Sequence, residues 1–236
     1  MGLLPLVAQG AEVRRRGKRL IGPVDLRLDG QGITIVVGPN GAGKTSFLQM
    51  LHGILRLSRG SVTWNCAIEQ AQERQAFVFQ SPVMMRRSVV DNVAYPLRVA
   101  GLSRRVARAR AQEWVERIGL GPLARRPAAV LSGGERQKLA LARALIRGPE
   151  VLFLDEPCAS LDGRATREIE ALLKEAVRGG TRLVMSTHNM GQARRLADEI
   201  ILIARGQIQE QGPAGAFFDA PSSADGQAFL RGDIIE

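Results

Sequence analysis

Long apolar runs, cysteines and lysines are all scarce in this chain of 236 residues. Apolar runs such as 151–154 are far shorter than the roughly 20 residues that a membrane-spanning helix needs. No basic residue precedes the short apolar stretch at the N-terminus, so we expect no secretory signal. The two cysteines, Cys66 and Cys158, are too far apart in sequence to form a metal-binding pair. These absences favour a cytoplasmic protein with reduced thiols.

Aromatic residues are also few, which bears on the net charge of +10. Residues 81–147 contain 14 Lys or Arg against 4 Asp or Glu, whereas the remainder has 19 of each sign. Only Tyr95 and Trp114 fall in this basic segment, so it lacks the aromatic platforms on which bases stack, and we expect no nucleic-acid partner. The segment fits either docking beside an anionic membrane leaflet or a solvated helical surface in an arginine-rich protein.

Short apolar stretches alternate with helical patterns along the chain. Strands are predicted at residues 33–37, 77–80, 151–156 and 182–187, with a hairpin at 200–212. Helices are predicted at residues 43–55, 132–146 and 164–178, and a helical pattern runs from 89 to 118. Such alternation indicates an α/β protein with a mostly parallel sheet. The stretch from about 82 to 147 has no convincing strand and is predicted to be a helical insertion.

GPNGAGKT, residues 38–45, lies between a predicted strand and a predicted helix and matches the GxxxxGK[ST] phosphate-binding pattern. Its glycines let backbone N–H groups and the positive helix end face an anion. Lys44 is expected to reach the β- and γ-phosphates, and the Thr45 hydroxyl to ligate Mg²⁺. The nucleotide contacts predicted here are Gly38, Pro39, Asn40, Gly41, Ala42, Gly43, Lys44, Thr45 and Ser46.

VLFLDE, residues 151–156, supplies two carboxylates at the end of a predicted buried strand. Ligand chemistry in α/β proteins lies at the carboxyl ends of strands. Asp155 is therefore predicted to hold Mg²⁺, directly or through water, and Glu156 to polarise the attacking water.

LSGGE, residues 131–135, combines a helix cap with a glycine pair. Ser132 and Glu135 have capping-box spacing, while Gly133 and Gly134 weaken the first helical turn by roughly 1 kcal/mol each relative to alanine. Taken alone, this pattern is also consistent with a plain helix start. The exposed amides nevertheless form an anion site with no obvious anion in the same subunit.

LSGGERQ, GPNGAGKT and VLFLDEP together resemble the ATPase subunit of an ATP-binding cassette (ABC) transporter, over about residues 24–212. Gln80, the ASLD segment at 159–162, and His188 after RLVMST extend the resemblance. It implies a P-loop ABC-ATPase fold in one nucleotide-binding domain, residues 1–236, with a mixed, largely parallel sheet and an N-terminal antiparallel β part. Residues 1–81 and 148–236 would form the ATPase core, and 82–147 a helical subdomain with the signature motif.

The resemblance also implies roles for individual residues. Glu156, His188 and Gln80 would be catalytic, with His188 contacting the γ-phosphate and Gln80 sensing Mg²⁺ or the attacking water. In this family two subunits pack head to tail around two ATP molecules. Residues 132–135 (Ser132, Gly133, Gly134 and Glu135) would then bind the γ-phosphate held by the other subunit, and Asp162 would lie at the interface. His52 is interpreted as structural.

Two positions depart from the family pattern. Arg16 stands where an aromatic residue usually stacks on adenine, so either its guanidinium stacks on the base or adenine recognition is loose. We expect weak base selectivity. Cys158 stands two residues after Glu156, where Thr or Phe is common; packing is its expected role, and sensitivity of the ATPase to oxidation is the alternative.

The subtype is inferred from similarity alone. A single cassette without a spanning segment resembles an importer subunit on the cytoplasmic face of the membrane, working with permease subunits and indirectly with a solute-binding protein. FQSPVMMRRSV and the ending AFLRGDIIE resemble subunits for oxyanion uptake, tungstate first, then phosphate or molybdate. Importers of amino acids or other small solutes, and a soluble ABC ATPase acting on DNA or the ribosome, are alternatives. A P-loop kinase or GTPase is disfavoured, because no NKxD pattern occurs.

Overall fold

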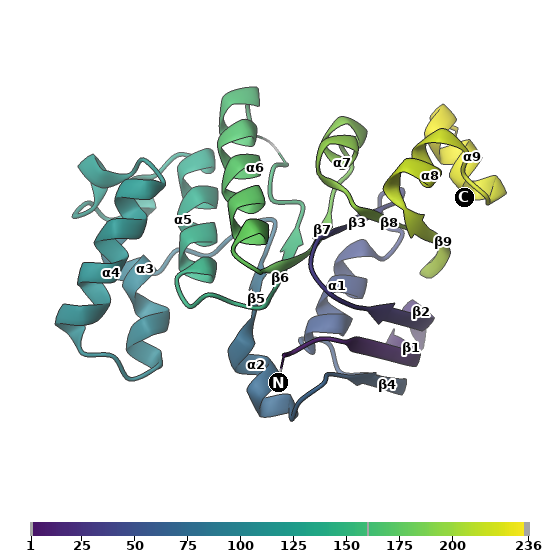
Figure 1. The fold of residues 1–236 in the computed structure, drawn as a ribbon, viewed down its shortest axis with the longest axis horizontal. Coiled ribbons are helices and arrows are strands. Elements are labelled where there is room, and N and C mark those ends of the chain that lie inside the picture. The colour runs from purple at the N-terminus through teal and green to yellow at the C-terminus, as the bar shows by residue number, and fades with distance from the viewer. Residues whose placement is uncertain (1, 160, 234–236) are drawn as a thin grey trace.

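The computed structural model describes residues 2–159 and 161–233, and its strands form two sheets (Figure 1). The smaller sheet is antiparallel, with the order β2–β1–β4, and consists of β1 (Leu6–Arg15), β2 (Lys18–Leu28) and β4 (Arg59–Thr63). The larger has the order β5–β6–β7–β3–β8–β9. Its strands are β3 (Ile33–Val37), β5 (Gln75–Val78), β6 (Val151–Asp155), β7 (Arg182–Ser186), β8 (Glu199–Ala204) and β9 (Gln207–Pro213).

The larger sheet is parallel except for β9, which pairs antiparallel with β8 at one edge. Every residue of β3, β6 and β7 is buried, which explains why these strands are almost continuously apolar in sequence. Because neighbouring parallel strands end at the same edge, the segments that follow Val37, Asp155 and Ser186 meet there.

Helices cover both faces of the larger sheet. Helix α1 (Lys44–His52) packs between the two sheets and buries Phe47, Leu48 and Leu51 in a core shared with the antiparallel sheet (Figure 1). A second core lies on the opposite face, beneath α5 (Gly133–Leu145), α6 (Gly163–Arg178), α7 (Met190–Leu196), α8 (Ala214–Asp219) and α9 (Ala224–Arg231). Helix α2 (Ile68–Arg74) leads into β5.

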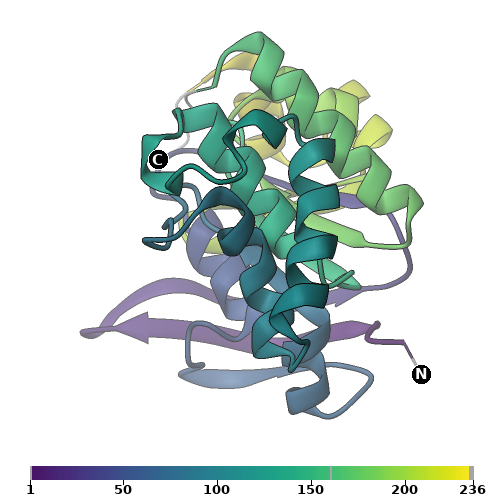
Figure 2. The same ribbon diagram turned by 90° about the vertical axis from the view of Figure 1, so that its left-hand side faces the viewer.

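The segment between β5 and β6 contains only helices and loops. Helices α3 (Val89–Val99) and α4 (Arg104–Arg117) form a hairpin beside α5 and, with α5, bury a third apolar core of their own. Short 3₁₀ turns at Gly121–Leu123 and Ala128–Val130 complete the segment. Figure 2, seen from this side, shows these helices in front of the sheet.

The predicted α/β class, with its separate antiparallel part, is confirmed, while several predicted bounds were wrong. Strand β5 ends at Val78, so Phe79 and Gln80 lie in the following loop rather than in a strand. Helix α1 stops at His52, because Gly53 takes a left-handed conformation there. The helical pattern over 89–118 is divided into α3 and α4.

Some predictions cannot be compared with the structure. Ser160, within the ASLD segment, and residues 234–236 of the AFLRGDIIE ending lie outside the described residues. Within the described ranges, no helix combines the length and apolar character needed to cross a bilayer.

Candidate active site

The loop of residues 38–43 joins the end of β3 to the start of α1. Gly38 has φ 146° and Gly43 has φ 107°. A Cβ at Gly38 would lie 2.0 Å from the carbonyl oxygen of Ile203, and one at Gly43 would lie 2.8 Å from that of Leu20. Both positions therefore need glycine, because the loop passes against the backbone of β8 and β2 with no room for a side chain.

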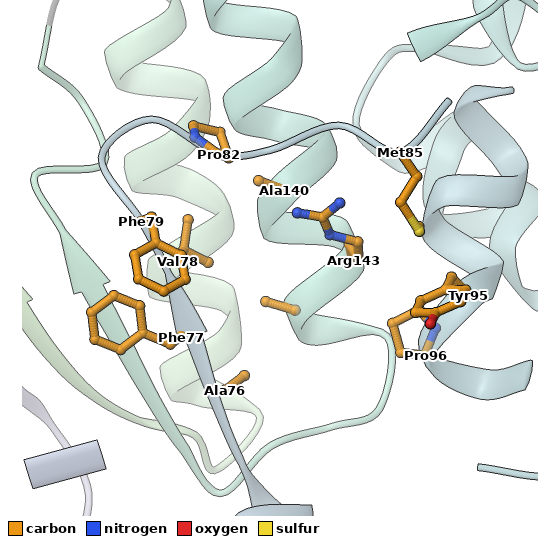
Figure 3. Close-up of a pocket in the computed structure, with 11 residues that line it drawn as sticks. Ala76, Phe77, Val78, Phe79, Pro82, Met85, Tyr95, Pro96, Ala140 and Arg143 are labelled. Atoms are coloured by element: carbon orange, nitrogen blue, oxygen red, sulfur yellow. The ribbon is translucent and has the colours of Figure 1, made fainter. Parts of the chain in front are cut away.

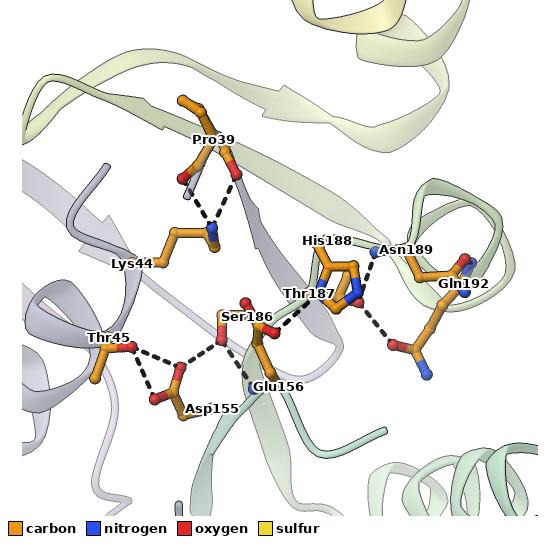
Figure 4. Close-up of polar contacts among 11 residues, drawn as sticks. Pro39, Lys44, Thr45, Asp155, Glu156, Ser186, Thr187, His188, Asn189 and Gln192 are labelled. Atoms are coloured by element: carbon orange, nitrogen blue, oxygen red, sulfur yellow. Dashed lines mark hydrogen bonds and ion pairs between the residues drawn. The ribbon is translucent and has the colours of Figure 1, made fainter. Parts of the chain in front are cut away.

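Lys44 is the first residue of α1, and its ammonium group bends back over the loop (Figure 4). Nζ donates to the carbonyl oxygens of Gly38 at 2.8 Å and Pro39 at 3.0 Å. Burial lowers the pKa of Lys44, and the negative charges of Glu156 and Asp155 act in the opposite direction. The loop thus places a cation beside the amides at a helix N-terminus, an arrangement that attracts phosphate groups.

Thr45, Asp155 and Ser186 are hydrogen-bonded where α1, β6 and β7 meet (Figure 4). The Thr45 hydroxyl lies 2.8 and 3.0 Å from the two carboxylate oxygens of Asp155. Ser186 Oγ donates to Asp155 Oδ1 at 2.7 Å. Since Asp155 is only 4% exposed, these hydroxyls replace the water that would otherwise solvate its charge.

The adjacent oxygens of Thr45 and Asp155 suit a hard divalent cation such as Mg²⁺, which prefers hydroxyl and carboxylate ligands. Gln80, predicted to sense Mg²⁺ or the attacking water, makes no hydrogen bond to Thr45 or Asp155 among the described residues. It lies instead in the loop after β5, where it lines a hollow with Gly133 and Leu161. Among the described residues, no group of three or more His, Cys, Asp or Glu is arranged to hold a metal ion.

Glu156 follows β6 with φ 44°, a conformation uncommon for any residue but glycine. Its backbone N–H donates to Ser186 Oγ at 3.0 Å, which ties this turn to β7. Its Oε2 lies 2.8 Å from Nδ1 of His188, whose side chain is 59% exposed. The structure therefore brings together two residues predicted separately to be catalytic, as an oriented carboxylate and an accessible imidazole, which can take up and pass on a proton.

Ser186 is a residue that sequence reasoning missed. It is fully buried, and its one hydroxyl donates to the side chain of Asp155 and accepts from the backbone of Glu156. A signal was present in the sequence: a small polar residue ends the apolar strand RLVMS. Strand register, which pairs Ser186 with Asp155, was needed to interpret that signal.

The LSGGE motif forms the predicted capping box at the start of α5. Ser132 N donates to Glu135 Oε2 at 2.8 Å, and this bond is the main cause of the lowered pKa of Glu135. The glycines differ in their surroundings. A Cβ at Gly133 would meet nothing within 4 Å, whereas one at Gly134 would lie 3.2 Å from Cβ of Ala165 on α6. The first glycine leaves the helix end open, and the second lets α5 and α6 pack closely.

Three other residues singled out in the sequence lie in different surroundings. Arg16 is at the exposed tip of the β1–β2 hairpin, and its contact with the base stays a prediction. Asp162 caps α6 by accepting from the Ala165 amide at 2.8 Å. Cys158 packs against the second core, and burial raises the pKa of its thiol, which disfavours the reactive thiolate.

Known proteins resemble this chain over most of its length. It is 37% identical to the sulfate/thiosulfate import ATP-binding protein CysA of Mesorhizobium japonicum, over 90% of this chain and 65% of that protein. It is 36% identical to the tungstate uptake system ATP-binding protein TupC of Peptoclostridium acidaminophilum, over 86% of this chain and 94% of that protein. Other relatives are named for import of Fe(3+) ions, phosphate and nickel. The match to one of the iron relatives covers 59% of that protein's length.

A solved structure and a family model agree with these relatives. The structure of cbiO1 from Clostridium perfringens, described as part of the ABC transporter complex cbiONQ, is 26% identical with a TM-score of 0.81, covering 93% of this chain and 92% of that one. The family model described as ABC transporter matches residues 21–159. These matches confirm the predicted ABC-ATPase fold, and the chain belongs to the ABC transporter family.

Proposed function

We propose that the chain is the ATP-hydrolysing subunit of an ABC importer, bound to the cytoplasmic side of a membrane permease. The observation that carries the proposal is the arrangement at the carboxyl edge of the sheet. There a glycine-dependent loop, a buried lysine and the paired side chains of Asp155–Thr45 and Glu156–His188 converge. Each has the chemistry that phosphoryl transfer to water requires.

In this mechanism the ATP phosphates lie along residues 38–43, where loop amides and the Lys44 ammonium offset their charge. Mg²⁺ held by Thr45 and Asp155 would neutralise further phosphate charge. Glu156 orients the attacking water and accepts its proton, while His188 fixes the carboxylate through Nδ1.

A second copy of the chain completes the site in this proposal. The amides of Gly133 and Gly134 keep no partner within the described part of the chain, and Gly133 faces open space at a positive helix end. A head-to-tail homodimer would place this end on the γ-phosphate bound by the other subunit. Asp162, whose side chain caps α6, would stand at the same interface.

A cavity of about 290 Å³ beside the loop after β5 is the proposed docking site for a permease segment (Figure 3). Its lining is mainly apolar and includes Phe79, Pro82, Met85 and Tyr95. Phe79 is 44% exposed and Tyr95 40%, and exposed apolar side chains gathered at one place are typical of protein contacts. Gln80, next to Phe79 in the chain, could transmit the state of the nucleotide site to this cavity.

Tungstate is the proposed cargo, with phosphate or molybdate next. FQSPVMMRRSV, the chain ending and the similarity to TupC support an oxyanion, while relatives named for iron and nickel support other solutes equally by identity. The deciding experiment coexpresses the chain with any permease and solute-binding protein found encoded beside it and measures ATP hydrolysis in vesicles. Stimulation by tungstate but not sulfate is expected; stimulation by DNA or ribosomes instead would identify a soluble ABC ATPase.

Glu156→Gln tests the enzymatic part of the proposal. The amide keeps the shape of the side chain but accepts protons poorly, so the variant should bind ATP, turn over about a thousandfold more slowly and accumulate as an ATP-bound dimer. Size exclusion and phosphate release measure these effects. Glu150→Gln, at a site remote from the loop, is the control. Full activity of Glu156→Gln would remove Glu156 from its role.

A further inference from the structure

A groove of about 360 Å³ lies between α3 and α4, and arginines dominate its lining. These helices are at the front in Figure 2. The lining residues are Arg87, Asp91, Ala94, Arg98, Arg104 and Arg108. The nucleotide loop contributes nothing to this lining, so the groove is a separate feature of the basic helical segment.

Most of the positive charge in the groove has no carboxylate partner among residues 2–159 and 161–233. Asp91, the one acidic lining residue, lies 3.3 Å from Nε of Arg108, so that pair is close to neutral. Within the described part of the chain, the Arg98 guanidinium donates only to the carbonyl oxygen of Leu102, at 3.1 Å. The Arg87 guanidinium lies over the ring of Tyr95, 5.3 Å from its centroid. The Arg104 guanidinium has no hydrogen bond or ion pair within the described residues.

Helix α4 adds to this positive potential. Its N-cap is Ser103, its first turn contains Arg104 and Arg105, and no acidic residue is present there. Cations at a helix N-terminus are unfavourable, because the helix dipole is positive at that end. The fold therefore keeps arginines where the backbone disfavours them, and a bound anion would relieve both the dipole and the unpaired guanidinium groups.

We propose that this groove binds a phosphate-bearing anion at a site distinct from the nucleotide loop. Arginine is suited to this ligand, since its planar fork donates two parallel hydrogen bonds to phosphate oxygens. The phosphate could belong to an anionic lipid headgroup or to a soluble phosphate ester. A nucleic acid fits less well, because among the described residues Tyr95 is the one aromatic ring found against a groove arginine, and Arg87 covers it.

Two probes distinguish the sources. Calorimetry with pyrophosphate is done on full-length Lys44→Ala, which weakens binding at the nucleotide loop, and sedimentation with phosphatidylglycerol vesicles is done on the otherwise unchanged chain. Arg87→Gln/Arg104→Gln removes two groove cations. Arg110→Gln/Arg147→Gln removes the same charge from exposed positions of the same basic segment outside the groove. We expect about tenfold weaker binding of one probe in the groove pair and less than about twofold in the control pair.

Asp91→Asn provides a test of opposite sign. It removes the groove's one lining carboxylate and frees Arg108, so binding should strengthen about threefold, an effect that misfolding cannot imitate. Groove-dependent binding of vesicles identifies a lipid headgroup, and groove-dependent binding of pyrophosphate identifies a soluble ligand. Equal losses in both arginine pairs, binding of neither probe, no gain in Asp91→Asn, or tighter groove-dependent binding of a single-stranded oligonucleotide would each overturn the proposal.

Discussion

The carboxyl edge of the large sheet and the helical segment at 82–147 present their functional groups in opposite ways. At the edge, polar side chains are buried or hydrogen-bonded to one another, and the loop at 38–43 fits only glycine at two positions. In the helical segment, the features of interest are exposed side chains: the apolar rim around Tyr95 and the arginines of the groove.

This difference predicts two kinds of response to substitution. Changes at the edge should alter nucleotide binding and hydrolysis in the isolated chain, since the neighbours that fix each group are in the same molecule. Changes to the apolar rim and to the groove arginines should leave hydrolysis without the permease unaffected and appear only when the permease or the groove ligand is present. Substitutions in each region test whether the two regions respond in these different ways.

Lys44→Ala should have the largest effect. It removes the buried ammonium group that lies beside Gly38 and Pro39, so ATP affinity should fall about a thousandfold through loss of several charge-assisted contacts. Titration of a fluorescent ATP analogue measures the change. Lys174→Ala, an exposed lysine on α6, should bind normally. If Lys44→Ala bound ATP as tightly as the unchanged chain does, Lys44 and its loop would have no role in nucleotide binding.

His52→Phe tests the buried side of α1. Burial lowers the pKa of His52 from 6.5 to about 4, and its ring lies edge-on to Phe77 and Phe153. Between about pH 6.5 and 4, His52 is protonated in the unfolded chain but stays neutral in the folded chain. The stability due to this group is therefore complete above pH 6.5 and is lost as the pH falls to about 4, by about 3 kcal/mol.

Urea unfolding between pH 7 and 4 measures that loss. In His52→Phe the decline should be smaller by the same amount, because no buried group remains to be protonated there. An unchanged slope in His52→Phe would mean that other groups dominate acid unfolding.

Ser186→Ala should lower the turnover rate about tenfold and raise the Mg²⁺ concentration needed for half-maximal rate. The alanine leaves the Glu156 amide without its acceptor and leaves Asp155 Oδ1 with the Thr45 hydroxyl alone, so both carboxylates are held less firmly. Ser186→Thr keeps the hydroxyl and should restore the Mg²⁺ dependence. An unaltered Mg²⁺ requirement in Ser186→Ala, with only lower stability, would show a purely structural role.

The contacts of Ser186 are an example of what the sequence alone did not predict. The loop at 38–45 and the carboxylates of Asp155 and Glu156 follow fixed local patterns, because backbone geometry and strand ends dictate them. The partners Ser186 and His188 lie on β7 and the loop beyond it, and their contacts depend on which strand neighbours β6. Local pattern does not determine that order.

At the end of β5, the sequence pattern predicted too long a strand. Apolar pattern extended the strand to Gln80, but Phe79 and Gln80 leave the sheet and Phe79 forms part of an exposed cavity. An apolar residue that faces a partner looks, in sequence, like one that faces the core. The groove arginines were likewise visible as charge but not as a site, because their convergence depends on how α3 packs on α4.

Val83→Glu tests the apolar surface of the helical segment. Val83 is 79% exposed in the loop beside the docking cavity, where Arg143 donates to its carbonyl oxygen. A carboxylate there should leave hydrolysis by the isolated chain unchanged and weaken stimulation by the coexpressed permease about fivefold, because the charge would be desolvated on docking. Val99→Glu, 67% exposed at the end of α3, is the matched control. Equal losses in both would argue against a defined docking cavity.

Arg16→Asn should have the smallest effect, and it tests recognition of the nucleotide base. Arg16 has φ 50° and precedes Gly17 at φ 79°, so asparagine, which tolerates this conformation, changes the side chain without straining the turn. If Arg16 stacks on the base, the variant should bind ATP about threefold more weakly, as expected for an exposed cation–π contact. The unchanged chain should hydrolyse ATP and GTP at similar rates, because a guanidinium discriminates little between purines. Arg19→Asn on the same hairpin is the control, and strict ATP dependence would assign base recognition to residues other than this hairpin.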